Sequence, residues 1–124
     1  MKTRFFRCKE CGNIVELIND GSGTLVCCGQ PMIELKANTS DGAKEKHVPF
    51  ITKDGDKLTV KIGSIPHPMT GEHYIQWVAA VTDKGIFRKE LKPGDTPEVS
   101  FCCLGTVVAV YEYCNLHGLW KIDL

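Results

Sequence analysis

The fold is decided by residues 73–85, His-Tyr-Ile-Gln-Trp-Val-Ala-Ala-Val-Thr-Asp-Lys-Gly. Ile75, Trp77, Ala79 and Val81 recur at every second position, and side chains two residues apart share one face of a β-strand. The run closes with Asp-Lys-Gly, a typical turn sequence. These residues predict a strand with Ile75, Trp77, Ala79 and Val81 on one face, followed by a tight turn.

The same period continues on both sides of this strand. Leu58, Val60 and Ile62 alternate with polar residues, and no window carries a helical apolar stripe. Further β-type runs, separated by turn residues, cover residues 86–91, 98–104 and 106–113. Residues 37–124 therefore predict an antiparallel β-sandwich that begins with a polar linker at residues 37–44.

Residues 1–36 differ from the rest because they hold four closely spaced cysteines and no histidine. The cysteines come in two groups, Cys8 with Cys11 and Cys27 with Cys28, around an apolar run at residues 14–18 and a turn at 19–23. This order predicts a β-hairpin with a cysteine knuckle at each end. So short a segment cannot bury a stable core, so we expect a metal ion to stabilise a separate domain over residues 1–36.

Composition limits the functional classes. The 124 residues carry 15 basic and 15 acidic side chains, which does not favour nucleic acid or an anionic membrane surface as a partner. No run approaches the roughly 20 apolar residues of a membrane helix, and the basic N-terminus lacks the apolar segment of an export signal. Seven cysteines, an odd number, favour metal binding over a disulfide framework. These features predict a soluble cytoplasmic protein.

The four N-terminal cysteines predict a tetrahedral tetrathiolate site. Gly12 follows the first knuckle and allows the backbone to fold around an ion, whereas the adjacent pair Cys27 and Cys28 requires an irregular turn. Zinc and iron both suit four sulfur ligands, and zinc is the commoner use of such spacing. The cysteine spacing by itself therefore favours structural zinc and leaves an iron electron-transfer centre open.

The four histidines and Cys114 suggest a second metal site. Cys114 and His117 are separated by two residues, His67 lies between two prolines, and His47 is followed closely by Pro49. Prolines stiffen the backbone beside these side chains, so the histidines are expected on rigid loops that converge at one end of the sandwich. His73 completes the set. The pattern alone leaves open whether the four share one ion or are unrelated surface histidines.

The chemistry of this second donor set favours a redox metal. Four imidazoles and one thiolate exceed the four ligands usual for structural zinc and differ from the blue-copper set. Five donors leave one octahedral position for a small molecule, and a single anionic ligand leaves the site net positive. Lys46, beside His47, adds a charge that attracts anions.

At these residues the chain resembles the desulfoferrodoxins, the two-iron superoxide reductases. The resemblance spans essentially the whole chain, and its order and spacing are highly specific. It is carried by the two cysteine knuckles and by residues 45–49, 66–77 and 114–118. The resemblance implies a desulforedoxin-like N-terminal domain, residues 1–36, followed by an immunoglobulin-like β-sandwich, residues 37–124.

The resemblance also implies the roles of individual residues. Ferric iron would be held by four thiolates: Cys8, Cys11, Cys27 and Cys28. A second iron, ferrous when active, would have axial Cys114 and four equatorial histidines: His47, His67, His73 and His117. Glu45 would cap the sixth position after oxidation, and Lys46 would attract superoxide and position a water that supplies a proton.

The implied activity is one-electron reduction of superoxide to hydrogen peroxide, with re-reduction by a rubredoxin-type donor and assembly as a homodimer. Two other classes are open to test: an electron carrier that works through the four-cysteine site, and a zinc-stapled binding module.

Cys102 and Cys103 have no role in this scheme. Strand alternation predicts that one points inward as a small hydrophobe and the other is a partly exposed thiol. A regulatory thiol and an intermolecular disulfide are the alternatives.

Overall fold

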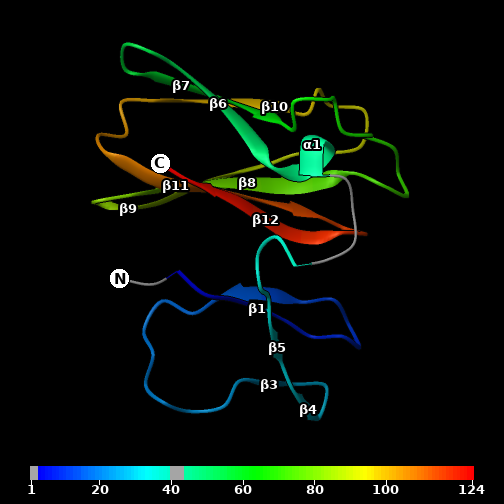
Figure 1. The fold of residues 1–124 in the computed structure, drawn as a ribbon. Helices are drawn as coiled ribbons and strands as arrows, with labels where there is room; N and C mark the ends of the chain where they lie inside the picture. Colours follow the sequence, from blue (N-terminus) through cyan, green and yellow to red (C-terminus); the bar gives the residue numbers. More distant parts are fainter. Residues whose placement is uncertain (1–2, 40–43) are drawn as a thin grey trace. The chain divides into compact units, whose positions relative to one another are not determined.

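The computed structural model describes residues 3–39 and 44–124, without the side chains of residues 44 and 45. The chain divides into two compact units, Met1–Lys36 and Ala37–Leu124 (Figure 1). Strands dominate both, and the one helix among the described residues is α1 (Lys44–His47). Of the predicted linker at residues 37–44, residues 40–43 lie outside the described residues. The prediction of a mainly β fold, with a small metal-binding N-terminal part before an antiparallel sandwich, is confirmed.

The first unit consists of five short strands. They are β1 (Phe5–Arg7), β2 (Ile14–Glu16), β3 (Val26–Cys27), β4 (Gln30–Pro31) and β5 (Ile33–Glu34). β1 pairs with β2 on one side and β5 on the other, and β3 pairs only with β4. The single hairpin predicted with a knuckle at each end is therefore wrong. Each knuckle instead closes its own hairpin, because the turn that follows β2 does not bring β2 against β3.

The second unit is a sandwich of seven strands. They are β6 (Pro49–Asp54), β7 (Lys57–Ile62), β8 (Ile75–Thr82), β9 (Gly85–Glu90), β10 (Glu98–Cys102), β11 (Val107–Cys114) and β12 (Gly118–Asp123). One sheet has the order β10-β7-β6 and the other β12-β11-β8-β9, and every pairing is antiparallel. The apolar side chains between the two sheets form the core, with Val60, Val78 and Val110 completely buried.

The face assignment for β8 is partly wrong. Ile75 packs in the core with Val78 and Ala80, whereas Trp77 lies on the other face and stacks on Tyr113. The cause is an irregularity in the pairing: Trp77 faces Tyr113, but the next pair joins Ile75 to Cys114. This bulge adds one residue to β8 and reverses the alternation at Ile75.

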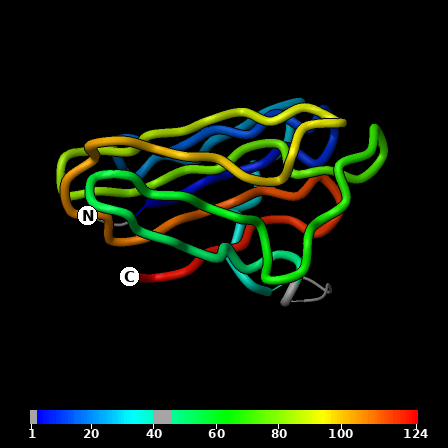
Figure 2. The backbone as a smooth tube through the Cα atoms, turned by 90° about the horizontal axis from the view of Figure 1, so that it is seen from above, coloured from blue at the N-terminus to red at the C-terminus, as the bar shows by residue number. Residues whose placement is uncertain are grey.

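Two connections of the sandwich meet at one end. Seen from above, the long connection from β7 to β8 and the turn from β11 to β12 lie at the same end (Figure 2). Hydrogen bonds join them: the backbone N–H of Asn115 donates to the Tyr74 carbonyl at 3.2 Å, and the Asn115 side-chain oxygen accepts from the Tyr74 N–H at 2.9 Å. This end carries the histidine cluster.

Candidate metal centres

The first cluster consists of four sulfur atoms within 4.8 Å of one another: those of Cys8, Cys11, Cys27 and Cys28. Cys11 Sγ lies 3.6 Å from Cys27 Sγ, which lies 4.0 Å from Cys28 Sγ. Sulfur atoms about 2.3 Å from a tetrahedral ion are about 3.8 Å apart. The four sulfurs therefore fit a single metal ion.

The two hairpin turns aim these sulfurs inward. In the first turn the Gly12 N–H donates to the Cys8 carbonyl at 2.8 Å, and Gly12 has φ +82°, which favours glycine. In the second, Cys27 pairs with Gln30, and both Cys28 (φ +52°) and Gly29 (φ +73°) are left-handed. Two left-handed residues make a two-residue type I′ turn. This turn explains how adjacent cysteines reach one point.

The thiols of this cluster influence one another's protonation. The pKa of Cys8 is lowered to about 7, chiefly because the backbone N–H of Cys11 donates to its sulfur. The pKa of Cys28 is raised to about 12 and that of Cys27 is also raised, in both cases mainly through hydrogen bonding with the Cys11 thiol. Without a cation, the thiols of Cys27 and Cys28 therefore retain protons that an ion would displace.

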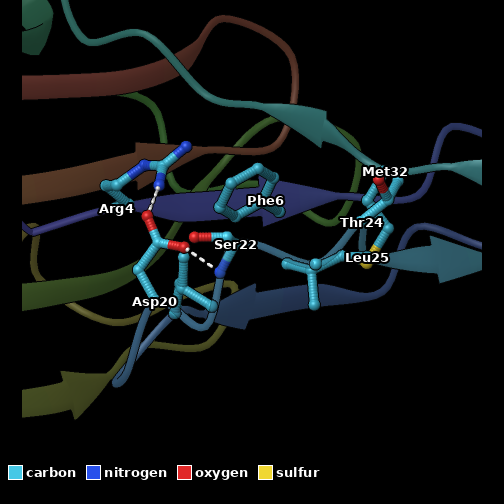
Figure 3. Close-up of a pocket in the computed structure, with 9 residues that line it drawn as sticks. Arg4, Phe6, Asp20, Ser22, Thr24, Leu25 and Met32 are labelled. Atoms are coloured by element: carbon cyan, nitrogen blue, oxygen red, sulfur yellow. Dashed lines mark hydrogen bonds and ion pairs between the residues drawn. The ribbon is translucent and has the colours of Figure 1, made fainter.

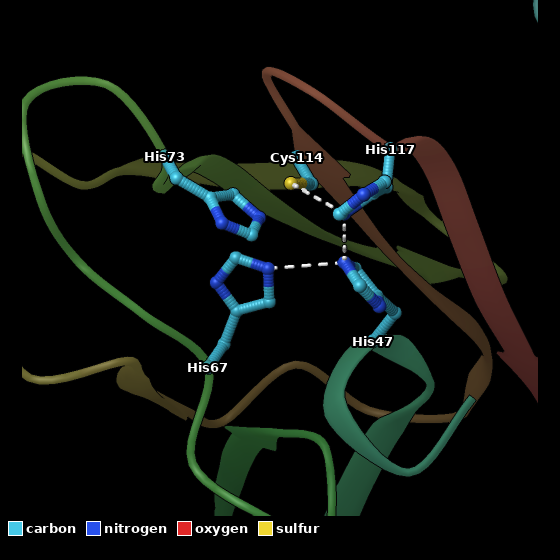
Figure 4. Close-up of side chains that lie close together, drawn as sticks. All are labelled: His47, His67, His73, Cys114 and His117. Carbon is cyan, nitrogen blue, oxygen red and sulfur yellow. Dashed lines mark hydrogen bonds between the residues drawn. The ribbon is translucent and has the colours of Figure 1, made fainter. Parts of the chain in front are cut away.

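The second cluster combines four imidazoles and one thiol whose donor atoms lie within 4.8 Å of one another: His47, His67, His73, Cys114 and His117. Figure 4 shows the rings converging on the space beside the Cys114 sulfur. His47 Nε2 is 3.0 Å from both His67 Nε2 and His117 Nδ1, and Cys114 Sγ is 3.9 Å from His117 Nδ1. An octahedral ion with bonds of about 2.1 Å places neighbouring nitrogens about 3.0 Å apart. The spacing fits one ion.

The ring nitrogens are oriented for binding. His67 Nδ1 lies 2.6 Å from the Pro68 carbonyl oxygen, so Nδ1 carries the proton and Nε2 keeps its lone pair for a metal. His73 Nε2 is buried and has no hydrogen-bond partner among the described residues. A buried polar nitrogen without a partner is costly, and an ion at the centre of the cluster satisfies it.

Burial favours the neutral form of two of the imidazoles, His67 and His73. Burial lowers the pKa of His67 to about 4 and also lowers that of His73, to which the charges of His117 and Lys46 contribute further. Neutral imidazole is the form that binds metals. Burial raises the pKa of Cys114, although backbone hydrogen bonds from His117 and Leu116 oppose it. A cation in the cluster supplies the charge that a buried thiolate needs.

Two residues position the ligands without belonging to the cluster. The Asn115 side chain joins the two loops, since its Nδ2 donates to the Glu72 carbonyl at 3.0 Å while its oxygen accepts from Tyr74. Trp120 is buried, stacks on the His47 ring at 4.8 Å and donates from Nε1 to the His117 carbonyl at 3.0 Å. The signal for Asn115 was its place between Cys114 and His117.

A buried acid lies close to this cluster. Glu112 is fully buried in β11, and neither carboxyl oxygen has a hydrogen-bond partner among the described residues. Burial raises its pKa well above the usual value, so this carboxyl holds its proton at acidic pH. Glu112 was not predicted from the sequence, because in a strand pattern it occupies an ordinary polar position.

Glu45 and Lys46 both lie in α1, the turn of helix that carries His47. Lys46 is exposed to solvent. The side chain of Glu45 lies outside the described residues, so the structure gives no position for the predicted capping carboxylate.

The first unit also has a hollow of about 320 Å³, shown in Figure 3. Arg4 and Asp20 form an ion pair of 2.8 Å on its wall, and the Asp20 carboxylate also accepts the Ser22 N–H. Arg4 bonds Glu34 as well at 2.9 Å. The charged side chains on its wall, Arg4 and Asp20, thus pair with each other, whereas the two donor clusters direct several ligand atoms at one point.

Comparison with known proteins agrees with these two sites. The desulfoferrodoxin family model matches residues 39–123, and the model of the desulfoferrodoxin N-terminal domain matches residues 1–35. The chain belongs to the desulfoferrodoxin family. It is 52% identical over 118 residues to the desulfoferrodoxin of Nitratidesulfovibrio vulgaris, covering 95% of this chain and 94% of that one.

Solved structures extend the comparison. The superoxide reductase of Treponema pallidum has a TM-score of 0.82 and 38% identity, covering 99% of this chain and 100% of that one. The one-iron superoxide reductase of Giardia intestinalis has a TM-score of 0.53 and 31% identity, covering 65% of this chain and 100% of that one.

The two donor clusters match the two iron centres of the desulfoferrodoxins, so iron is the metal of both sites. The prediction of two iron cofactors is confirmed. The cysteine spacing taken alone favoured zinc at the four-cysteine site, and membership of this family assigns iron there instead. Among the described residues no helix is long and apolar enough to cross a membrane.

Proposed function

We propose that this chain is a superoxide reductase that converts superoxide to hydrogen peroxide at the four-histidine, one-cysteine site. The observation that carries the proposal is the convergence of five donors, four of them neutral, at one end of the sandwich. The superoxide reductases of Treponema pallidum and Giardia intestinalis support it by their similarity to this chain.

His47, His67, His73, His117 and Cys114 are the proposed ligands of this iron. When bound, the iron supplies the electron that reduces superoxide. Five donors leave one of six octahedral positions for a small anion, and one thiolate does not cancel the charge of a divalent ion. The Cys114 thiolate would donate electron density to the bound metal.

Lys46 is proposed to attract the substrate. Its ammonium group is exposed, one residue from His47, and its charge adds to the effects of burial and of His117 in lowering the pKa of the His73 ring. A positive charge at the entrance raises the local concentration of a small anion. Its ammonium also orients a water molecule that gives a proton to the product.

Glu45 is proposed to cap the oxidised site, a role supported by its position two residues before His47 in α1.

Two domains are proposed to divide the work. Residues 1–36 hold iron on Cys8, Cys11, Cys27 and Cys28 as an accessory centre, and residues 37–124 carry out the reaction. A rubredoxin-type protein is the proposed donor. The exposed side chains of Ile18, Val26 and Ile33 support a homodimer formed through the first domain. We place the protein in the cytoplasm, where five thiolate ligands stay reduced.

Stopped-flow mixing with superoxide tests the function. The reduced protein is expected to oxidise rapidly at the histidine site and to yield peroxide equal to the superoxide consumed, without matching dioxygen. Abundant dioxygen would show dismutation instead and would contradict the proposal.

A further inference from the structure

Cys102 and Cys103 are the two cysteines that neither iron site uses. They stand at the end of β10, and the prediction that one points inward is wrong, because both are exposed. The structure joins their sulfurs in a disulfide between neighbouring residues. The pair therefore presents two sulfur atoms to solvent in the reducible form of a bridge.

The backbone explains this double exposure. Cys102 pairs with Lys57 of β7, but Cys103 turns into the left-handed region at φ +65°, and its N–H donates to the Asp56 carbonyl at 2.9 Å. Strand alternation stops at this turn, so the second side chain does not enter the core. A non-glycine residue in this region is uncommon and frequently marks a functional position.

The same arrangement occurs at the first iron site. Cys27 ends β3 and is followed by left-handed Cys28, just as Cys102 ends β10 and is followed by left-handed Cys103. At Cys27 and Cys28 the turn delivers two thiols to a metal. Around Cys102 and Cys103, no third histidine, cysteine or carboxylate of the described residues completes a metal-binding cluster. Two adjacent thiols without further ligands suit oxidation better than metal binding.

There is room for a small reagent beside the pair. A hollow of about 180 Å³ is lined by Cys103, Lys57 and Leu104, among others. Lys57 is exposed and lies directly across the strand pair from Cys102. A positive charge near a thiol favours its nucleophilic thiolate form.

We propose that Cys102 and Cys103 form a thiol pair that hydrogen peroxide oxidises reversibly to a disulfide. One thiolate attacks the peroxide, so that an S–O bond forms, the O–O bond breaks, and the departing oxygen leaves as water after protonation. The second thiol then displaces the hydroxyl of the sulfenic acid, so that an S–S bond forms and a second water leaves. Two electrons pass from the two sulfurs to one peroxide.

The source of the oxidant rests on the proposed function, because hydrogen peroxide is its product. The bridge is suited to reversal. Its Cα atoms are 3.8 Å apart, the spacing set by one peptide bond, and most disulfides span a longer separation. A bridge outside the usual separation is more readily reduced by a cellular dithiol.

Direct oxidation tests the thiol pair independently of superoxide chemistry. The iron-loaded protein is reduced with a phosphine, freed of it, treated with equimolar hydrogen peroxide and alkylated with N-ethylmaleimide. Fragment-ion mass spectrometry is expected to find Cys102 and Cys103 unalkylated, with their peptide about two mass units below the dithiol form. Dithiothreitol should restore alkylation at both. Visible absorption of the irons confirms that both sites remain loaded.

Cys103→Ser and Cys102→Ser are the matched variants. Each should lose the internal bridge, and the remaining cysteine should be trapped by dimedone as a sulfenic acid. Continued alkylation of both cysteines in the wild-type protein after peroxide would overturn the proposal, as would a bridge linking two chains instead of the two neighbours.

A second arm replaces added peroxide by a superoxide source and an electron donor, with catalase as the control. Oxidation of the pair that catalase suppresses supports the full scheme. Oxidation by added peroxide but not under superoxide would leave the thiol site standing and count against the proposed function.

Discussion

The two iron sites of this chain differ in what surrounds the metal. The four-cysteine cluster sits on strands of two or three residues, and Cys11 and Cys28 are exposed. The histidine–cysteine cluster is attached to a sandwich with strands of up to eight residues, and His47, His67 and Cys114 are buried. The four-cysteine site stabilises the small first unit, whereas the packed sandwich of the second unit positions the ligands of the histidine–cysteine site.

This difference assigns separate chemistry to the sites. Four thiolates saturate a tetrahedral ion and leave no position for a substrate, so the first site can pass electrons and stabilise its fold. Five donors, four of them neutral, leave the second ion positively charged and one octahedral position free. Only the second site suits the binding and reduction of a small anion.

Removal of iron should give the largest contrast between the units. Structural metal sites in short segments contribute on the order of 10 kcal/mol to folding. Chelation is therefore expected to abolish amide-exchange protection in β1 and β2, whereas Val78 and Val110 in the sandwich core keep theirs. Hydrogen exchange followed by mass spectrometry measures both. Equal loss of protection in the two units would contradict the contrast.

Proton release should differ next. Metal binding requires thiolates, and the pKa of Cys28 is about 12 while that of Cys8 is about 7. Because the pKa of Cys8 lies between pH 6 and pH 8, ferrous ion should displace more protons from the four-cysteine site at pH 6 than at pH 8. At pH 8 the histidine site should release fewer protons than the four-cysteine site, because one of its five ligands is a thiol and the pKa of His67 is about 4.

The sign of this effect follows from the same pKa values. Affinity falls on acidification wherever binding releases protons, so the four-cysteine site should lose iron more steeply as the pH drops. Anaerobic calorimetry in buffers of different ionisation enthalpy counts the protons, with Cys114→Ser and Cys11→Ser isolating the two sites. Equal numbers of protons released at the two sites would contradict the predicted difference between them.

His47→Ala should disable the second site and spare the first. Loss of residues that merely orient a metal ligand costs 10–100-fold, so loss of a ligand should reduce the superoxide reaction on the order of 100-fold or more. Iron analysis should find the tetrathiolate absorption intact and the histidine-site iron missing. Full reactivity in this variant would remove His47 from the site.

Lys46→Ala should have the smallest effect. Removing one steering charge is expected to slow superoxide capture several-fold at low salt and to weaken its dependence on ionic strength. Lys84→Ala is the matched control, because Lys84 is an exposed cation in the turn after β8, the far end of that strand from His73. The same slowing in both variants would show general charge attraction instead of a role for Lys46.

The sequence predicted donors better than it predicted geometry. Cysteine and histidine spacing marked all nine residues of the two clusters as candidate ligands, because ligand types are visible in a sequence, and the resemblance to the desulfoferrodoxins assigned them to two sites. The bulge at Ile75 was not visible, since it depends on how β8 pairs with Cys114 of a distant strand. The hydrogen bonds by which Asn115 joins the two loops, and the stacking of Trp120 on His47, were missed for the same reason. Both are long-range contacts between residues that look ordinary in the sequence.

The turn at Cys103 escaped prediction for a local reason. Alternation along the run 98–104 treats every residue as extended, but the hydrogen bond from Cys103 to Asp56 places it in a left-handed turn. Cys28 was anticipated as irregular because two adjacent ligands demanded it. Without a known ligand, the same conformation at Cys103 gave no signal in the sequence.

The central claim is that superoxide reacts at the histidine–cysteine site. Stopped-flow spectroscopy of reduced Cys11→Ser and Cys114→Ser proteins mixed with superoxide tests it most directly. The account predicts that Cys11→Ser oxidises its histidine-site iron at nearly the wild-type rate and forms peroxide, whereas Cys114→Ser loses the reaction. Loss of superoxide reactivity in Cys11→Ser, with Cys114→Ser unaffected, would contradict the account and make the four-cysteine site the working centre.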